Sequence, residues 1–180
     1  MAMTFRSDRR DDDLEDSPLQ ERVVRISRVA QVAKGGRHLS FNAGVVVGDG
    51  EGTVGIGMGK ADAVPDAVRK GTVNARKNLI TVPIKDGTLP HEITAKFGAS
   101  VVMMRPAPPG TGVIAGGAVR AVVELAGFKD VVTKARRSTN PINTMKAAFK
   151  ALGLLRMPEE EFRRRRGLVE AVAEREARAQ

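Results

Sequence analysis

The chain of 180 residues contains no cysteine. Without thiols it can form neither a disulfide framework nor a thiolate metal site, and a reducing cytoplasm is the simplest environment for it. The two histidines, His38 and His91, have no acidic or histidine companion nearby at metal-ligand spacing. No local arrangement of serine, histidine and aspartate suggests catalysis, although this pattern does not address partners distant in sequence. We therefore expect no enzyme activity, no metal and no cofactor.

Aromatic residues are scarce as well. Tryptophan and tyrosine are absent, and the six phenylalanines are scattered along the chain. Proteins that read single-stranded nucleic acid usually stack bases on exposed aromatic side chains. Recognition of folded RNA by its shape and phosphates needs mainly Lys, Arg and polar groups. The composition favours the second mode.

Long apolar runs are also missing. No run approaches the ~18 residues of a membrane-spanning helix, and the beginning of the chain lacks the hydrophobic stretch of a signal peptide. Asp11, Asp12 and Asp13 argue against an organellar transit peptide, which is poor in acids. We expect no membrane partner.

What the chain does have is positive charge, with a net charge of +9 and a pI near 10.5. Residues 1–18 form a small, polar and net acidic arm, which we expect to be disordered. The positive excess therefore belongs to the rest of the chain. Such a charge distribution predicts a shaped binding surface for a polyanion.

Alternating apolar and polar residues predict three strands of an antiparallel meander in a domain spanning 19–81. The first begins at Glu21, and one face carries Val24, Ile26, Ala30 and Val32, interrupted by Arg28. The second has an apolar face made of Leu39, Phe41, Ala43, Val45 and Val47. The third alternates Val54, Ile56 and Met58 with Gly55, Gly57 and Gly59, so its bare face should admit a close neighbour.

A helix is expected over 62–79. Its buried stripe consists of Val64, Val68, Gly71, Ala75 and Leu79. The opposite side carries Arg69, Lys70, Arg76 and Lys77, which form either a solvated helix face or an RNA-binding stripe. Of the two hairpin turns, we interpret the acidic one, residues 48–52, as an ordinary turn. The basic one, residues 34–37, has two glycines between cations and suits contact with phosphates.

A second α+β domain is expected over 82–155, with strands near 80–85, 91–97, 100–104 and 131–135. Helices follow near 116–126 and from Asn140, a favourable N-cap, to Gly153, with Ile142, Met145, Phe149 and Leu152 buried. Residues 156–180 should form a charged helical extension with ion pairs such as Glu161 with Arg165. The predicted fold class is α+β, with a three-stranded antiparallel sheet plus helix, then two helices on a mixed sheet.

Two short segments match parts of nucleotide-binding motifs, but they lack the sequence context that these motifs require. Gly110, Gly112 and Ala115 match a dinucleotide fingerprint, with Asp130 at the expected distance. However, prolines separate these glycines from the preceding strand, where a tight strand-to-helix turn is needed. Gly59 and Lys60 lack the remaining residues of a phosphate-binding loop.

Several longer motifs, in order over roughly 21–153, resemble the family of small-subunit ribosomal protein five. They are Lys34-Gly35-Gly36-Arg37, Val47-Gly48-Asp49-Gly50, Val54-Gly55-Ile56-Gly57, Gly59-Lys60-Ala61, Gly110-Thr111-Gly112-Val113-Ile114-Ala115-Gly116-Gly117 and Ser138-Thr139-Asn140-Pro141-Ile142-Asn143.

The resemblance implies a first domain similar to the double-stranded-RNA-binding fold and contact with ribosomal RNA near the head–body junction, beside the messenger RNA entry path. It implies small-subunit proteins four and eight as neighbours, and no homo-oligomer is expected. The loop at 34–37 would reach ribosomal RNA near the spectinomycin site. Residues Thr111, Gly112, Gly116 and Gly117 would belong to the region linked to decoding accuracy.

The expected RNA-binding residues are mostly cations of the two domains. They are Arg25, Arg28, Lys34, Gly35, Gly36, Arg37, Lys60, Arg69, Lys70, Arg76, Lys77, Arg136, Arg137 and Asn140. Two alternatives remain open at this point: a free double-stranded-RNA-binding regulator, and a small-molecule kinase that shares the fold of the second domain.

Overall fold

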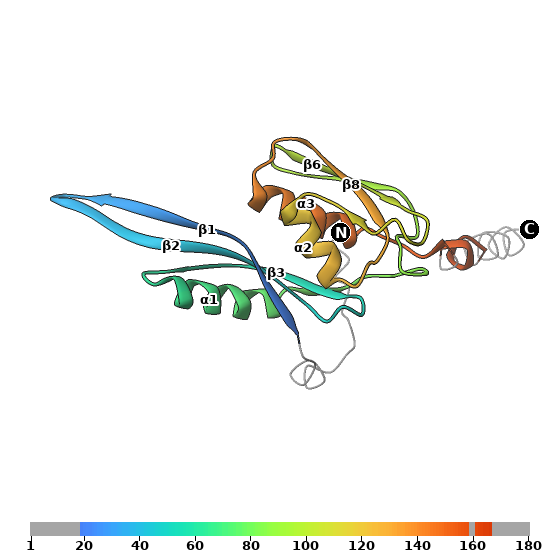
Figure 1. Cartoon of the computed structure of the whole chain (residues 1–180), viewed down its shortest axis with the longest axis horizontal. Coiled ribbons are helices and arrows are strands. Elements are labelled where there is room, and N and C mark those ends of the chain that lie inside the picture. The colour runs from blue at the N-terminus through green and yellow to red at the C-terminus, as the bar shows by residue number, and fades with distance from the viewer. Residues whose placement is uncertain (1–18, 159–160, 167–180) are drawn as a thin grey trace, which may run out of the picture.

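The computed structural model describes residues 19–158 and 161–166. Its first sheet is antiparallel with the order β1-β2-β3-β4. The elements are β1 (Gln20–Ala33), β2 (Gly36–Gly48), β3 (Thr53–Ala61), α1 (Val64–Arg76) and β4 (Leu79–Thr81). The predicted meander and helix are confirmed (Figure 1). The predicted acidic arm, residues 1–18, lies outside the described residues.

The prediction of a strand over 80–85 in the second domain was wrong. The strand there is β4, which pairs with the beginning of β3 through Leu79 with Gly55 and Thr81 with Thr53. Helix α1 returns the chain to that end of β3, and Pro83, which has no N–H, stops further pairing. The first sheet therefore has a fourth, short edge strand.

The second sheet has the order β5-β6-β8-β7 and is mixed, because β7 runs parallel to β8. Its strands are β5 (Ile93–Phe97), β6 (Ser100–Pro106), β7 (Val113–Ile114) and β8 (Val131–Arg137), and its helices are α2 (Gly117–Leu125) and α3 (Pro141–Leu152). The predicted α+β class is confirmed. The sequence did not reveal β7, since two residues inside a proline- and glycine-rich loop are too few for a periodic pattern.

Helix α1 packs on the glycine face of β3. A Cβ added at Gly57 would lie 2.1 Å from the Gly71 carbonyl oxygen, and one at Gly59 would lie 1.9 Å from that of Ala67. Only small residues fit such a close approach, so α1 buries Ala67, Gly71, Thr72 and Ala75. Part of the predicted stripe was therefore wrong: Val64 and Val68 are only half-buried, and Leu79 belongs to β4.

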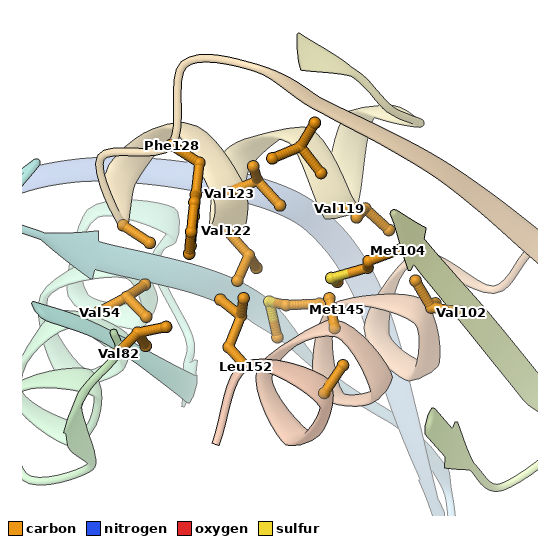
Figure 2. Packing of buried hydrophobic residues seen from close by; sticks show 14 of the residues in the cluster. Val54, Val82, Val102, Met104, Val119, Val122, Val123, Phe128, Met145 and Leu152 are labelled. Carbon is orange, nitrogen blue, oxygen red and sulfur yellow. The ribbon is translucent and has the colours of Figure 1, made fainter. Parts of the chain in front are cut away.

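Strand β2 is apolar on both faces. Val45 and Val47 face α1, while Val46 belongs to the larger core, which also contains residues of α2 and α3. Figure 2 shows Val54 of β3 and Val82, which follows β4, in one packed cluster with Val122 of α2 and Leu152 of α3. The domain boundary near residue 82 stays a prediction: the two sheets separate there, but the larger core includes residues from both sides of it.

The acidic turn between β2 and β3 does more than reverse the chain. The Asp49 carboxylate accepts hydrogen bonds from the N–H groups of Glu51 (2.7 Å) and Thr53 (2.9 Å). The Gly50 N–H donates to the Leu125 carbonyl at 3.0 Å, and a Cβ at Gly127 would lie 2.1 Å from the Gly50 oxygen. Our interpretation as an ordinary turn missed this docking on the end of α2, because it depends on residues distant in sequence.

Helix α3 follows its prediction closely. The Asn140 side chain accepts a hydrogen bond from the Ile142 N–H, and Gly153 is the C-cap. Met145 and Leu152 are buried, whereas Ile142 and Phe149 are half-buried. Of the predicted C-terminal extension, residues 161–166 are helical, and Glu159 and Glu160 lie outside the described residues.

The close packing of β3 on α1 predicts a large effect of a single methyl group. Gly57→Ala should lower the free energy of unfolding by about 1–3 kcal/mol or more, because the helix must move away from the sheet. Gly117→Ala is the matched control, since nothing lies within 4 Å of its Cβ position. Urea unfolding followed by circular dichroism measures both. Equal unfolding midpoints for the two variants would contradict the packing described here.

Candidate nucleic-acid interface

The far half of the β1–β2 hairpin forms a two-stranded ribbon. Phe41 of β2 pairs with Arg28 on one side and with Ala61, the last residue of β3, on the other. Beyond this point, residues 29–33 pair only with residues 36–40. Figure 1 shows the ribbon extending well past α1 and the second sheet. A two-stranded hairpin is marginally stable by itself in water, so this extension suits a partner that supports it.

The tip of the ribbon is exposed. Lys34 and Gly35 connect the strands, and Gly35 has φ of +93°. Gly36 does not have a positive φ, so only one of the two glycines of this turn adopts the left-handed conformation. Nothing lies within 4 Å of a Cβ built on either glycine. The tip is therefore open to a close neighbour, and Arg37 beside it is also exposed.

A bulge between Val23 and Arg25 changes the faces of β1. The extra residue, Val24, packs against the larger core. The side chain of Ile26 lies on the opposite face of the sheet, the one that faces α1, and is 44% exposed. The predicted single face containing both residues is therefore wrong, because a bulge reverses the alternation. After the bulge the register places Arg28 on the α1 face and Arg25 on the opposite one.

Cations lie on both faces of the hairpin. Arg28 and Arg37 share the α1 face with Val32, which is 77% exposed. On the other face, Arg25 hydrogen-bonds to Ser27 at 3.1 Å, and the register places Lys60 on this side as the partner of Asn42. A partner that surrounds the ribbon would meet positive charge on either side.

Helix α1 presents the predicted cations to solvent. Arg69, Lys70 and Lys77 are exposed. Arg76 is exposed too, but it pairs with Glu21 at 3.6 Å, and Glu21 also accepts a hydrogen bond from Thr72. The uncompensated stripe therefore consists of Arg69, Lys70 and Lys77, while Glu21 balances part of the charge of Arg76.

The second domain contributes Arg136 and Arg137 at the end of β8. Both are exposed, and Arg137 has φ of +63°, an uncommon conformation for a residue other than glycine. Such backbone strain is concentrated at functional sites. Asn140 caps α3 with its side chain, so its established role in this structure is structural and an RNA contact by it stays a prediction.

The loop containing Thr111 and Gly112 is held by internal hydrogen bonds. The Thr111 hydroxyl donates to the Pro108 carbonyl at 2.8 Å, and the Gly112 N–H donates to the Asp130 carboxylate at 2.8 Å. Asp130, the acid that completes the nucleotide fingerprint in the sequence, thus supports the loop. Nothing lies within 4 Å of a Cβ built on Gly116 or Gly117, so this surface is open.

Most cations of the candidate interface have no acidic partner among the described residues, whereas several arginines elsewhere are paired. Arg22, Arg105, Arg120 and Arg156 all form ion pairs. Among the described residues, no acidic side chain pairs with the cations of the ribbon, the exposed stripe or the end of β8. These are Arg25, Arg28, Lys34, Arg37, Lys60, Arg69, Lys70, Lys77, Arg136 and Arg137. Uncompensated positive charge is what a phosphate backbone requires.

The C-terminal extension shows the opposite arrangement. Glu161 pairs with Arg156 at 2.6 Å and Arg164 at 3.5 Å, so the predicted pairing with Arg165 was replaced by two others. The hydrogen bond from Arg156 lowers the pKa of Glu161. Part of the charge of these arginines is therefore balanced within the chain.

Residues 19–158 and 161–166 offer neither a metal-binding cluster nor a membrane-spanning helix. No cluster of three or more His, Asp or Glu side chains could hold a metal ion there. His91 instead accepts a hydrogen bond from the Arg156 N–H at 3.3 Å. In the same part of the chain, no helix is long and apolar enough to cross a membrane.

Comparison with known proteins gives two matching family models. Residues 19–83 match the N-terminal domain of ribosomal protein S5, and residues 95–166 match its C-terminal domain. The small ribosomal subunit protein uS5 of Chloroflexus aurantiacus is 56% identical over 160 residues, covering 89% of this chain and 90% of that protein. The protein of the same name from Rubrobacter xylanophilus is 55% identical over 140 residues, covering 78% of this chain and 70% of that protein.

Both family models and both relatives are named as one protein of the small ribosomal subunit. Members of this family are structural proteins and not enzymes, so the kinase alternative was wrong. The chain belongs to the ribosomal protein S5 family and is a structural, RNA-binding constituent of the small ribosomal subunit.

Proposed function

We propose that this chain binds small-subunit ribosomal RNA through the β1–β2 ribbon and the exposed side of α1, near the head–body junction and the messenger RNA entry path. The observation that carries the proposal is the ribbon itself: it leaves the body of the protein, and its cations have no acidic partner among the described residues. Electrostatic contact with phosphates supplies affinity, and the tip fixes the position of the protein.

The second domain supports the same role from another side. Arg136 and Arg137 add positive charge at the end of β8, and the open surface at residues 111–117 offers room for a protein neighbour. We expect small-subunit proteins four and eight as neighbours of this chain, and we link this surface to decoding accuracy. Through these contacts the chain would support subunit assembly, with messenger RNA nearby.

The α1 stripe can be tested in the isolated protein. Arg69→Glu with Lys70→Glu should weaken binding to a folded fragment of small-subunit ribosomal RNA. The slope of log affinity against log salt should fall by about 1.4–1.8, the value for two lost phosphate contacts. Fluorescence anisotropy over a salt series measures the slope, and circular dichroism checks the fold.

The matched control is Lys85→Glu with Lys129→Glu, which changes the net charge equally at exposed positions outside the ribbon and α1. An equal loss for both pairs would mean that only net charge matters and that the stripe is a solvated helix face.

The ribbon tip can be tested in cells. Gly35→Val should displace the tip, because its φ of +93° is strongly unfavourable for a branched side chain. Gly36→Val is the matched control, since Gly36 lacks a positive φ and its Cβ position is open. We expect normal subunit assembly in both variants and an altered response to spectinomycin that is greater for Gly35→Val.

Growth with and without the drug, together with sucrose-gradient profiles, measures these outcomes. An unchanged drug response for every substitution from residue 34 to residue 37, with normal assembly, would reduce the tip to an ordinary turn.

A further inference from the structure

A cavity of about 570 Å³ lies between the two domains, away from the ribbon tip. Its wall is made by residues of β3, α1, the turn that follows α1, β5 and α3. They are Ile56, Gly57, Met58, Asn74, Asn78, Phe97, Met145, Lys146, Phe149 and Lys150. This volume is within the range of ~300–1,000 Å³ typical of ligand sites.

The cavity exists because one edge of the first sheet is only partly covered. Strand β4 pairs with β3 at Thr53, Val54 and Gly55 and stops there, so no strand of the described chain continues beside Met58. The Asn74 side-chain amide donates to the Met58 carbonyl at 2.8 Å, and that of Asn78 donates to the Asn74 carbonyl at 2.9 Å. Their side-chain oxygens accept no hydrogen bond from the described residues.

Two aromatic rings that are distant in sequence meet at this cavity. Phe97, at the end of β5, is 39% exposed, and Phe149 of α3 is half-buried. The Lys146 ammonium lies 5.2 Å from the centroid of the Phe97 ring, within the range of a cation–π contact. Lys150, one turn further along α3, is exposed, and its ammonium donates to the Lys96 carbonyl at 3.5 Å.

The side chains of the wall indicate which kind of ligand would fit this cavity. The wall contains two lysines and no acidic residue, so it favours an anion. Aromatic and thioether side chains favour a flat, polarisable group, and stacking on an aromatic ring is how proteins hold unpaired bases. The amide oxygens of Asn74 and Asn78 can accept hydrogen bonds from the amino group of a base.

We propose that this cavity binds one unpaired nucleotide of small-subunit ribosomal RNA. The base lies against Phe97 and Phe149, and its phosphates lie near Lys146 and Lys150. The inference rests on the proposed RNA-binding function and adds a second recognition mode to it, because the ribbon and α1 contact only phosphates. An apolar side chain of a protein neighbour could contact the aromatic and thioether groups of the cavity, but it would leave the lysines and the amide oxygens without partners.

The absence of native cysteine allows a direct test. Phe97→Cys introduces a single thiol that can carry an aryl azide, and subunits assembled with this protein are then irradiated. We expect a discrete crosslink to one or two adjacent nucleotides, mapped by primer extension. Lys150→Cys, at an exposed position on the rim, should give the same nucleotides and replaces Phe97→Cys if that variant does not assemble.

A second measurement separates base insertion from mere proximity. In subunits with Phe97→Leu or Phe149→Leu, the base-pairing edge of the crosslinked nucleotide should become on the order of tenfold more reactive to base-modifying reagents, because stacking is lost. Phe162→Leu, at a ring that is 61% exposed and outside this cavity, should leave the reactivity unchanged.

A crosslink to protein, or a base whose reactivity is the same in all variants, would overturn the inference while leaving the proposed function intact. Failure of the unaltered protein to bind small-subunit ribosomal RNA would overturn both.

Discussion

Strand β2 imposes the constraint on which the rest of the structure depends. Val45 and Val47 need cover on one face, and Val46 needs cover on the other. Each fully buried valine contributes roughly 1.5–3 kcal/mol relative to exposure, so neither face can stay in water. Helix α1 covers one face and the helices of the second domain cover the other. The first sheet therefore becomes the middle layer of the molecule, and the second domain is attached by a shared core.

Helix α1 and the helices of the second domain cover only the near part of the β1–β2 hairpin. Strand β3 ends at Ala61, opposite Phe41 of β2. Beyond this pair, the hairpin carries cations, polar groups and partly exposed apolar groups. The same hairpin thus has two parts along its length: its near half organises the core, and its far half extends beyond the core, where we propose that it binds RNA. The docking of the acidic turn on α2 fixes the opposite end of the sheet, so the direction of the ribbon is set by the body of the protein.

The sequence predicted what local patterns determine. Alternation located β2 and β3, the bare glycine face indicated a close neighbour, and Asn140 marked the beginning of α3. It could not show where segments meet. The sheet to which β4 belongs depends on the path of α1, and the faces of β1 depend on a bulge that a period of two does not reveal. In the sequence Phe97 appeared only among scattered aromatics and Phe149 as a buried residue of α3, although folding brings both to one cavity.

Amide hydrogen exchange of the isolated protein and of assembled small subunits tests the role of the ribbon most directly. In the isolated protein, amides of residues 29–33 and 36–40 should exchange fast, because two strands without cover open easily. Those of Val45, Val46 and Val47 should exchange slowly, since they lie in the covered sheet. On assembly we expect strong protection of the ribbon and little change in β2 beneath the helices. A ribbon that is already protected in the isolated protein, or that still exchanges fast in the subunit, would contradict its assignment as the RNA-binding element.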